Sequence, residues 1–159
     1  MAAIHKLNEG LYEDYFDLIA LHCNLDDYAL GYSLNRYLKS SFKRRRDDFE
    51  ITPYVTVPIY EWRDDVKDSY WTFFANRVLG EETGPIDGIF KDALSFTKHY
   101  VIGEFRDVDY FIKIERDGPD HYRLAEQKKT LESLLSVPRI ITAYSIDTKE
   151  LKSQNHLIF

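Results

Sequence analysis

The hydrophobic pattern at the start of the chain predicts a strand followed by a helix. Tyr15–Leu21 is a run of aromatic and aliphatic residues with high β propensity, which is typical of a buried strand. The polar residues 24–27 suit a helix N-terminus, because acidic side chains there accept backbone N–H groups and face the positive end of the helix dipole. In 28–38 the apolar side chains recur at helical spacing, on a face made of Leu30, Leu34, Tyr37 and Leu38. Gly31 within this helix predicts close packing, since a mid-helix glycine costs about 1 kcal/mol relative to alanine.

The middle of the chain has the pattern of a series of strands. Runs of β-branched and aromatic residues bounded by turn-forming residues predict strands at Phe42–Ile51, Val55–Trp62, Ser69–Val78, Phe96–Ile102 and Asp109–Glu115. Pro53 and Pro58 confine the second of these to a sheet edge or a bulge. Gly80–Gly88, with three glycines and a proline, predicts a loop. The alternation within the last of these runs predicts a strand covered mainly on one face.

A second helix and a final strand close the chain. His121–Leu135 has helical spacing, with one face made of Leu124, Leu131, Leu134 and Leu135. Asp120 precedes it as a candidate N-cap, and the β-branched run Arg139–Ile146 follows it as a strand. This order of elements predicts an α+β fold, with a mostly antiparallel sheet and two helices packed on one face. We expect a single domain over residues 1–159, built on a ferredoxin-like core with extra strands.

Composition fits such a domain and argues against a duplex nucleic-acid binder. The 159 residues are 44% hydrophobic and 15% aromatic, which is enough for a core, and they carry a net charge of −6. The one basic cluster, Lys43–Arg46, is followed at once by two aspartates. A charged edge strand explains it better than a phosphate-binding stripe, since strand geometry divides the cations between two faces. Phe42, Phe49 and Tyr54 could stack on bases, so nucleic-acid binding is kept as a minor alternative.

The single cysteine and the hydropathy of the chain indicate a cytoplasmic protein. Cys23 has no second cysteine for an internal disulfide, and its apolar neighbours predict a buried thiol in a reducing compartment. No run approaches the roughly 20 apolar residues of a membrane helix, and the first residues lack the apolar stretch of a secretory signal. We therefore expect no membrane partner.

The residue types that carry chemistry are scattered along the chain. The five histidines lack the i, i+2 or i, i+4 spacing of metal ligands. Adjacent carboxylate pairs fall in predicted loops and helix starts, where capping and solvated turns are their usual roles. No P-loop, G-x-G-x-x-G, H-E-x-x-H, C-x-x-C or G-x-S-x-G motif occurs. The sequence therefore predicts no catalytic residue, no metal site and no cofactor.

Two apolar segments are candidates for an interface between subunits. Residues 70–74 carry more aromatic surface than one sheet face requires, so they are either core covered by a helix or a patch for self-association. The chain ends on three apolar residues, which dock either on their own domain, the alternative we favour, or on a partner subunit. The candidate interface residues are Tyr70, Trp71, Phe73, Phe74, Leu157, Ile158 and Phe159.

One segment resembles a family signature, through Ile102, Gly103, Glu104, Asp109 and Tyr110. In this order they are similar to the motif of the IPExxxDY family, an uncharacterised family of Bacteroidetes-type bacteria. Leu18–Tyr28 looks like the opening strand and helix of that family, and Ile146–Phe159 looks like its closing segment. The chain departs from the motif in two ways: Gly103 stands where the family has proline, and four residues separate Glu104 from Asp109 where the motif has three. The resemblance implies no assigned activity.

Two interpretations of this signature are open. In the first it is architectural: Gly103 adopts backbone angles that other residues avoid, and Glu104 turns back toward neighbouring N–H groups. Asp109 then caps the loop before it, and Tyr110 starts the next strand with its ring inward and its hydroxyl at the rim. In the second interpretation Glu104, Asp109 and Tyr110 line a small pocket. We favour the architectural interpretation.

Function is predicted only in outline. The leading hypothesis is a non-enzymatic binding or assembly module that forms a homodimer through its sheet. The alternative is a small-molecule-binding regulatory domain, similar in outline to ACT-like sensors, which rests on the predicted fold alone. An enzyme that uses Glu104 and Asp109 as an acid–base pair is the least favoured hypothesis.

Overall fold

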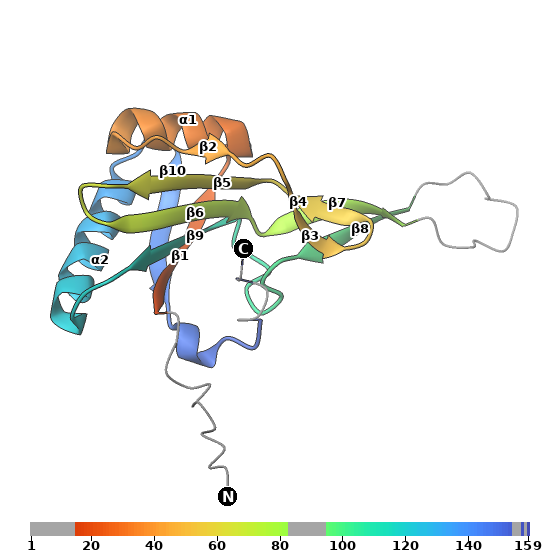
Figure 1. Ribbon diagram of the computed structural model, residues 1–159. Helices are drawn as coiled ribbons and strands as arrows, with labels where there is room; N and C mark the ends of the chain where they lie inside the picture. The colour runs from red at the N-terminus through yellow and green to blue at the C-terminus, as the bar shows by residue number, and fades with distance from the viewer. Residues whose placement is uncertain (1–14, 83–94, 154–156, 158) are drawn as a thin grey trace, which may run out of the picture.

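The computed structural model describes residues 15–82, 95–153, 157 and 159 of the chain (Figure 1). In these ranges a six-stranded sheet, two α-helices and two small two-stranded sheets form the fold. The helices are α1 (Asp27–Leu38) and α2 (Asp120–Leu135), and a short 3-10 helix, η1, covers Thr148–Glu150. The predicted α+β class is therefore confirmed. Neither helix of the described ranges is long and apolar enough to cross a membrane.

The large sheet is antiparallel throughout. Its strands lie in the order β10–β1–β9–β6–β5–β2, so β1, β9, β6 and β5 each have a neighbour on both sides. Ile112 shows the register, since it lies opposite Ile19 of β1 on one side and Phe73 of β6 on the other. The strands of this sheet are β1 (Phe16–Cys23), β2 (Lys43–Arg44), β5 (Ile59–Asp64), β6 (Ser69–Ala75), β9 (Tyr110–Arg116) and β10 (Ile140–Ile146).

Two hairpins extend from one end of the large sheet (Figure 1). They are β3 (Phe49–Thr52) with β4 (Val55–Val57), and β7 (Arg77–Glu82) with β8 (Ser95–Tyr100). The hairpins contact each other at Gly80 of β7, where an added Cβ would lie 2.4 Å from Cγ2 of Val55 in β4. Only glycine fits this close approach without displacing its neighbours. The prediction of a loop at Gly80 is therefore wrong, and residues 83–94 of that loop lie outside the described residues.

Three of the predicted strands are each divided in two. Phe42–Ile51 contains β2 and β3, with a bend between them. Val55–Trp62 is interrupted at Pro58, whose missing N–H cannot extend a strand ladder. Ser69–Val78 is interrupted at Asn76, where the chain leaves the large sheet for the second hairpin. The edge position expected for the basic cluster is confirmed, because β2 is the last strand of the sheet.

Both helices pack on the same face of the large sheet. Leu30 and Leu34 of α1 and Leu134 of α2 are buried in one apolar cluster with Phe73 of β6. Gly31 lies against the same ring: a Cβ at this position would come within 3.3 Å of Phe73 Cζ. The predicted close packing at Gly31 is therefore confirmed.

The opposite face of the sheet is buried as well. Residues 110–114 of β9 are all buried, so the prediction of one-sided cover for this strand is wrong. The cover consists of the loop 101–108 and the C-terminal residues, of which Leu157 is fully buried. Lys113 is buried on this side: its ammonium donates to the Leu157 carbonyl (2.8 Å) and to the Glu115 carboxylate (3.0 Å). These partners allow a charged side chain to alternate with apolar ones in a fully covered strand.

Helix α2 exposes part of the face that the sequence predicts as core. Leu124 and Leu135 are 66% and 50% exposed. The helix turns Glu126 inward beside Leu134. Glu126 tolerates burial because Lys67, from the turn between β5 and β6, donates to its carboxylate at 2.8 Å. The leucines near the two ends of α2 therefore remain on the surface of the single chain.

Candidate functional site

The signature segment is held in place by a buried asparagine, Asn76. This residue lies between β6 and β7 and is fully buried. Its main-chain N–H donates to the Asp109 carbonyl (2.9 Å), and its carbonyl accepts from the Val101 N–H (2.9 Å). Its side-chain amide donates to the Phe105 carbonyl (2.7 Å) and accepts from the Ile102 N–H (2.8 Å). One residue therefore connects both ends and the middle of the loop that follows β8.

Glu104 fastens the C-terminal segment to this loop. Its carboxylate accepts from the N–H groups of Lys152 (2.9 Å) and Ser153 (3.0 Å) and from the Ser153 hydroxyl (2.6 Å). These bonds, the hydroxyl foremost, lower the pKa of Glu104 because they stabilise its ionised form. Its own backbone N–H also stabilises the carboxylate, as predicted, but the partners at Lys152 and Ser153 are distant in the sequence. Gly103 has room for a Cβ and no left-handed backbone angle, so a glycine is not required there.

Asp109 and Tyr110 hold the end of β1. The Asp109 carboxylate accepts from the Cys23 N–H (3.0 Å), and the Asp109 N–H donates to the Leu21 carbonyl (3.2 Å). Asp109 therefore caps β1, whereas the sequence predicts that it caps its own loop. Tyr110 begins β9 with its ring buried, as predicted, and its hydroxyl donates to the Leu25 carbonyl (2.7 Å). Burial raises the pKa of this hydroxyl well above its usual value.

The two signature carboxylates hold different parts of the chain. Glu104 binds the C-terminal segment and Asp109 binds the end of β1, and the described residues give them no common hydrogen-bond partner. General acid–base catalysis needs groups that converge on one reacting centre. Ile102 is fully buried in the second apolar cluster. The geometry of the signature therefore supports the architectural interpretation.

The aromatic candidates for an interface lie mostly inside the chain. Trp71, Phe73 and Phe74 are buried, so the alternative of an exposed aromatic patch is wrong. These side chains alternate between the two faces of β6, and both faces are covered. Tyr70 is half-buried, and its hydroxyl donates to Glu61. Burial and this hydrogen bond raise the pKa of Tyr70 to about 12.

The C-terminal candidates dock on the chain's own sheet. Leu157 is buried in the cluster on the second face, and the Phe159 ring packs against Phe74 with 5.1 Å between ring centroids. Ile158 lies outside the described residues. These contacts explain why the chain ends on apolar residues.

The open edge of the large sheet is the surface least protected against pairing. β10 is last in the strand order, so the described part of the chain pairs it on one side only, with β1. Its sequence, Ile-Ile-Thr-Ala-Tyr-Ser-Ile, contains no charged residue and no proline. Ile141 and Tyr144 are 64% and 37% exposed. At the opposite edge, by contrast, β2 consists of the exposed residues Lys43 and Arg44.

Leu124, an exposed leucine of α2, lies next to this open strand. Helix α2 contacts β10, and Leu124 lines a shallow cleft together with Ser145 and Ile146 of the strand. Leu135 ends the helix shortly before the chain returns as β10. We call this surface the β10 edge: strand β10 with the side chains of Leu124, Leu135, Ile141 and Tyr144.

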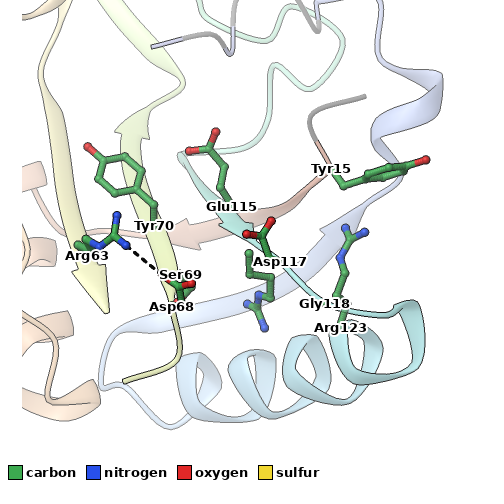
Figure 2. A pocket seen from close by; sticks show the side chains of 10 residues that line it. Tyr15, Arg63, Asp68, Ser69, Tyr70, Glu115, Asp117, Gly118 and Arg123 are labelled. Atoms are coloured by element: carbon green, nitrogen blue, oxygen red, sulfur yellow. Dashed lines mark hydrogen bonds and ion pairs between the residues drawn. The ribbon is translucent and has the colours of Figure 1, made fainter. Parts of the chain in front are cut away.

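A polar cleft of about 480 Å³ lies where β9 passes into α2 (Figure 2). Its lining includes Arg63, Arg116 and Arg123. Arg63 is exposed and pairs with two aspartates of the β5–β6 turn, but the side chains of Arg116 and Arg123 are only 6% and 15% exposed. No motif or pattern in the sequence predicts a site at these arginines. Asp17 was the available signal, since a carboxylate inside the apolar run of β1 must find buried partners.

Metal-ligating and nucleophilic side chains form no centre in the described ranges. No group of three or more His, Cys, Asp or Glu side chains there is placed to hold a metal ion. Cys23 is buried, as predicted. Burial raises the pKa of its thiol, which disfavours the reactive thiolate.

Comparison with known proteins finds no relative of this chain. No family model matches it, and neither a curated protein nor a solved structure matches it. The class that the described residues define is an α+β protein, with an uncharged strand at one edge of its large sheet and an arginine-lined cleft where β9 passes into α2. The proposals below therefore rest on the physical chemistry of those two surfaces.

Proposed function

We propose that this protein is a non-enzymatic assembly module in which two copies join at the β10 edge. The observation that carries the proposal is that β10, a seven-residue strand without charge, is open along one side in the described part of the chain. A long, uncharged edge strand offers unpaired N–H and C=O groups to any other strand. Natural proteins blunt such edges with charge, proline or short length, and β2 at the opposite edge has both charge and short length. The contrast supports a partner strand on β10.

A second copy of the chain fits this edge. Antiparallel pairing about a two-fold axis at Tyr144 puts Thr142 opposite Ile146, and Ala143 opposite Ser145, of the other copy. No like charges meet in this arrangement. The five residues involved follow a regular ladder with β1, because the irregular register lies at the other end of the strand, opposite Cys23. The two copies would extend the antiparallel sheet from one subunit into the next.

Side chains beside the strand supply the area that a dimer needs. Stable interfaces bury about 1,200–2,000 Å² in total, which exceeds what a short strand pair provides. Leu124 and Leu135 add exposed apolar surface on the face covered by helices. Tyr144 adds surface on the opposite face, since it lies opposite Ala20 of the second apolar cluster. Exposed apolar side chains that flank an open edge are typical of an interaction surface.

We also propose that the protein has a ferredoxin-like core, belongs to the IPExxxDY family and is located in the cytoplasm. The order β10–β1–β9–β6, with α1 after β1 and α2 after β9, is the order expected of a ferredoxin-like core, and β5 and β2 are then the extra strands. The family assignment rests on the signature residues of the loop before β9. The location rests on Cys23, a buried free thiol that suits a reducing compartment.

The experiment is a measurement of mass against concentration by sedimentation or light scattering. We expect a wild-type mass that rises toward twice 18.8 kDa as the concentration increases. Tyr144→Lys puts two lysines against each other on the proposed axis and should give a monomer at every concentration. Tyr54→Lys is the matched control, because it makes the same replacement at an exposed tyrosine in the turn between β3 and β4.

The control should associate as the wild type does. A wild-type protein that stays monomeric at the highest concentration it tolerates would overturn the proposal. So would Tyr144→Lys protein that is folded by circular dichroism and still dimerises with wild-type affinity.

A further inference from the structure

We infer that the cleft of Figure 2 binds a small oxyanion, a carboxylate or phosphate group, between Arg116 and Arg123. The inference goes beyond the proposed homodimer, because no residue of β10 lines this cleft. Arg116 ends β9, and Arg123 lies in the first turn of α2. The short connection between these two elements brings both guanidinium groups to one place.

The two guanidinium groups are incompletely paired. Arg116 Nε lies 3.5 Å from Asp17 Oδ2, and Arg123 Nη2 lies 3.5 Å from Asp17 Oδ1. Charge-assisted N–H···O⁻ hydrogen bonds are shorter, about 2.7–2.9 Å. Arg116 Nε, Arg123 Nε and Asp17 Oδ2 are buried atoms without a hydrogen-bond partner among the described residues. The Asp17 carboxylate therefore pairs with both buried guanidinium groups, and neither pair has the short distance of a full charge-assisted hydrogen bond.

Three carboxylates, Asp68, Glu115 and Asp117, line the same cleft, but none of them forms an ion pair with Arg116 or Arg123 among the described residues. Asp120 lies 3.7 Å from Arg123 but is almost fully exposed, so solvent screens the pair. Asp68 pairs with Arg63, which lines the same cleft, and Glu115 pairs with Lys113, which does not. A buried cation without full compensation is unfavourable. A bound oxyanion would add negative charge beside the two guanidinium groups and accept from their N–H groups that face the cleft.

Further groups in the cleft suit an oxyanion. The Ser69 hydroxyl is buried and accepts from Trp71 Nε1 (2.9 Å), so its O–H is left to donate to a ligand. Gly118 has φ +133° and no side chain, so a ligand can approach the backbone closely at this rim. Tyr15 lies beside Arg123 (Figure 2), with its ring centroid 5.3 Å from the guanidinium carbon, and orients that group.

The rim restricts the ligand to one compact anionic group. Asp68, Glu115 and Asp117 line the same cleft. Their negative charges repel a polyphosphate or a nucleic-acid backbone, which would place further charge beside them. A single carboxylate or phosphate can reach the two arginines without that repulsion.

The test is a titration of the full chain with sodium phosphate and, in parallel, with sodium acetate. Sodium chloride keeps the ionic strength constant, and binding is followed by backbone NMR shifts and by the melting temperature. We expect saturable shifts at residues of the cleft and a higher melting temperature with at least one of the two anions. Arg116→Lys keeps the charge, loses the planar donor fork and should weaken binding about tenfold. Lys128→Gln, at an exposed position of α2 that does not line this cleft, removes a full charge and should bind as the wild type does.

The relative affinity of the two anions identifies the ligand class: tighter binding of phosphate indicates a phosphate group, and tighter binding of acetate indicates a carboxylate. A folded wild-type protein that responds to neither anion beyond sodium chloride overturns the inference. Equal binding by Arg116→Lys and the wild type overturns it too; if that variant does not fold, Arg123→Lys takes its place. Tyr144→Lys separates this inference from the homodimer, because its cleft is intact and its response to anions should persist as a monomer.

Discussion

Replacing Asn76 should test the physical argument about the signature segment most directly. Asn76→Ala removes the two side-chain hydrogen bonds to Phe105 and Ile102, and leaves the main-chain bonds to Asp109 and Val101 in place. The Phe105 carbonyl then loses the donor that lies 2.7 Å away, and the Ile102 N–H loses the acceptor that lies 2.8 Å away. The Ile102 N–H is buried and is left without this partner, whereas the Phe105 carbonyl keeps a second hydrogen bond, from the Val108 N–H at 3.2 Å.

The magnitude follows from what each unpaired group costs. A buried donor or acceptor without a partner destabilises the folded state by about 1–3 kcal/mol. The unpaired Ile102 N–H accounts for that cost, and the lost second bond to the Phe105 carbonyl adds about 0.5–1.5 kcal/mol, so we expect a total of about 3 kcal/mol. For a chain of this length that loss corresponds to a fall in melting temperature of about 6–12 °C. It is a large part of a typical total stability of about 5–15 kcal/mol.

The assay is equilibrium unfolding in urea, with hydrogen exchange as a local readout. Asn24→Ala, at an exposed asparagine, is the control and should stay within about 0.5 kcal/mol of the wild type. Asn76→Asp separates hydrogen bonding from packing, since it keeps the size and one acceptor but sets a carboxylate against the Phe105 carbonyl. Its destabilisation should shrink at low pH, where the protonated carboxyl can donate. A loss below about 0.5 kcal/mol for Asn76→Ala, with unchanged amide exchange at Ile102, would refute the reasoning.

Three further predictions rest on single contacts. Gly80→Ala drives a Cβ into Val55 and should cost about 1–3 kcal/mol in urea unfolding, whereas Gly103→Ala has room and should change stability by less than about 0.5 kcal/mol; equal effects would contradict the packing argument. Asp17→Asn leaves two buried guanidinium groups without their carboxylate and should cost roughly 3–5 kcal/mol by the same assay, so a loss under about 1 kcal/mol would mean that the ion pairs are not needed. The folded-state pKa of Glu104 is lowered from its usual value of 4.5, so its contribution to stability is complete above that value and is lost as the pH falls through the folded pKa. Glu104→Gln should therefore flatten the acid dependence of amide protection at Ser153 between about pH 5 and pH 3, and an unchanged profile would show that Glu104 does not hold the segment.

Local patterns predict the elements whose signal is contained within a few residues. The side-chain spacing predicts a helix over residues 121–135. The observed helix, α2, begins one residue earlier, at Asp120, and ends at Leu135 as predicted. The run before Cys23 and the β-branched run after Pro138 predict β1 and β10 to within two residues. In each case the period of the side chains determines the backbone conformation directly.

Features that depend on distant partners could not be predicted in this way. The division of a long strand at Asn76 depends on a loop that follows some 25 residues later and contains its hydrogen-bond acceptor and donor. The second face of β9 is covered by the C-terminal segment, which is distant in the sequence. Lys113 lies on that face, and a charged residue at this point of the pattern is typical of a solvent-exposed face, so the sequence predicts no cover there. The arginine cleft depends on Asp17 meeting residues about a hundred positions away.

The exposure of Leu124 and Leu135 is the most informative disagreement between pattern and structure. Helical spacing assigns both leucines to the same apolar face as Leu134, yet the single chain buries only Leu134 fully. A hydrophobic pattern in the sequence reflects burial in the functional assembly, whereas the burial described above is that of a single copy of the chain. Leucines exposed at random on a helix need no explanation. Leu124 does need one, because it lies beside an uncharged edge strand that has no second partner strand in the described part of the chain. Pairing of β10 between two copies accounts for both observations at once, since the same two-fold contact pairs residues 142–146 and brings Leu124 of α2 from each copy to the subunit boundary.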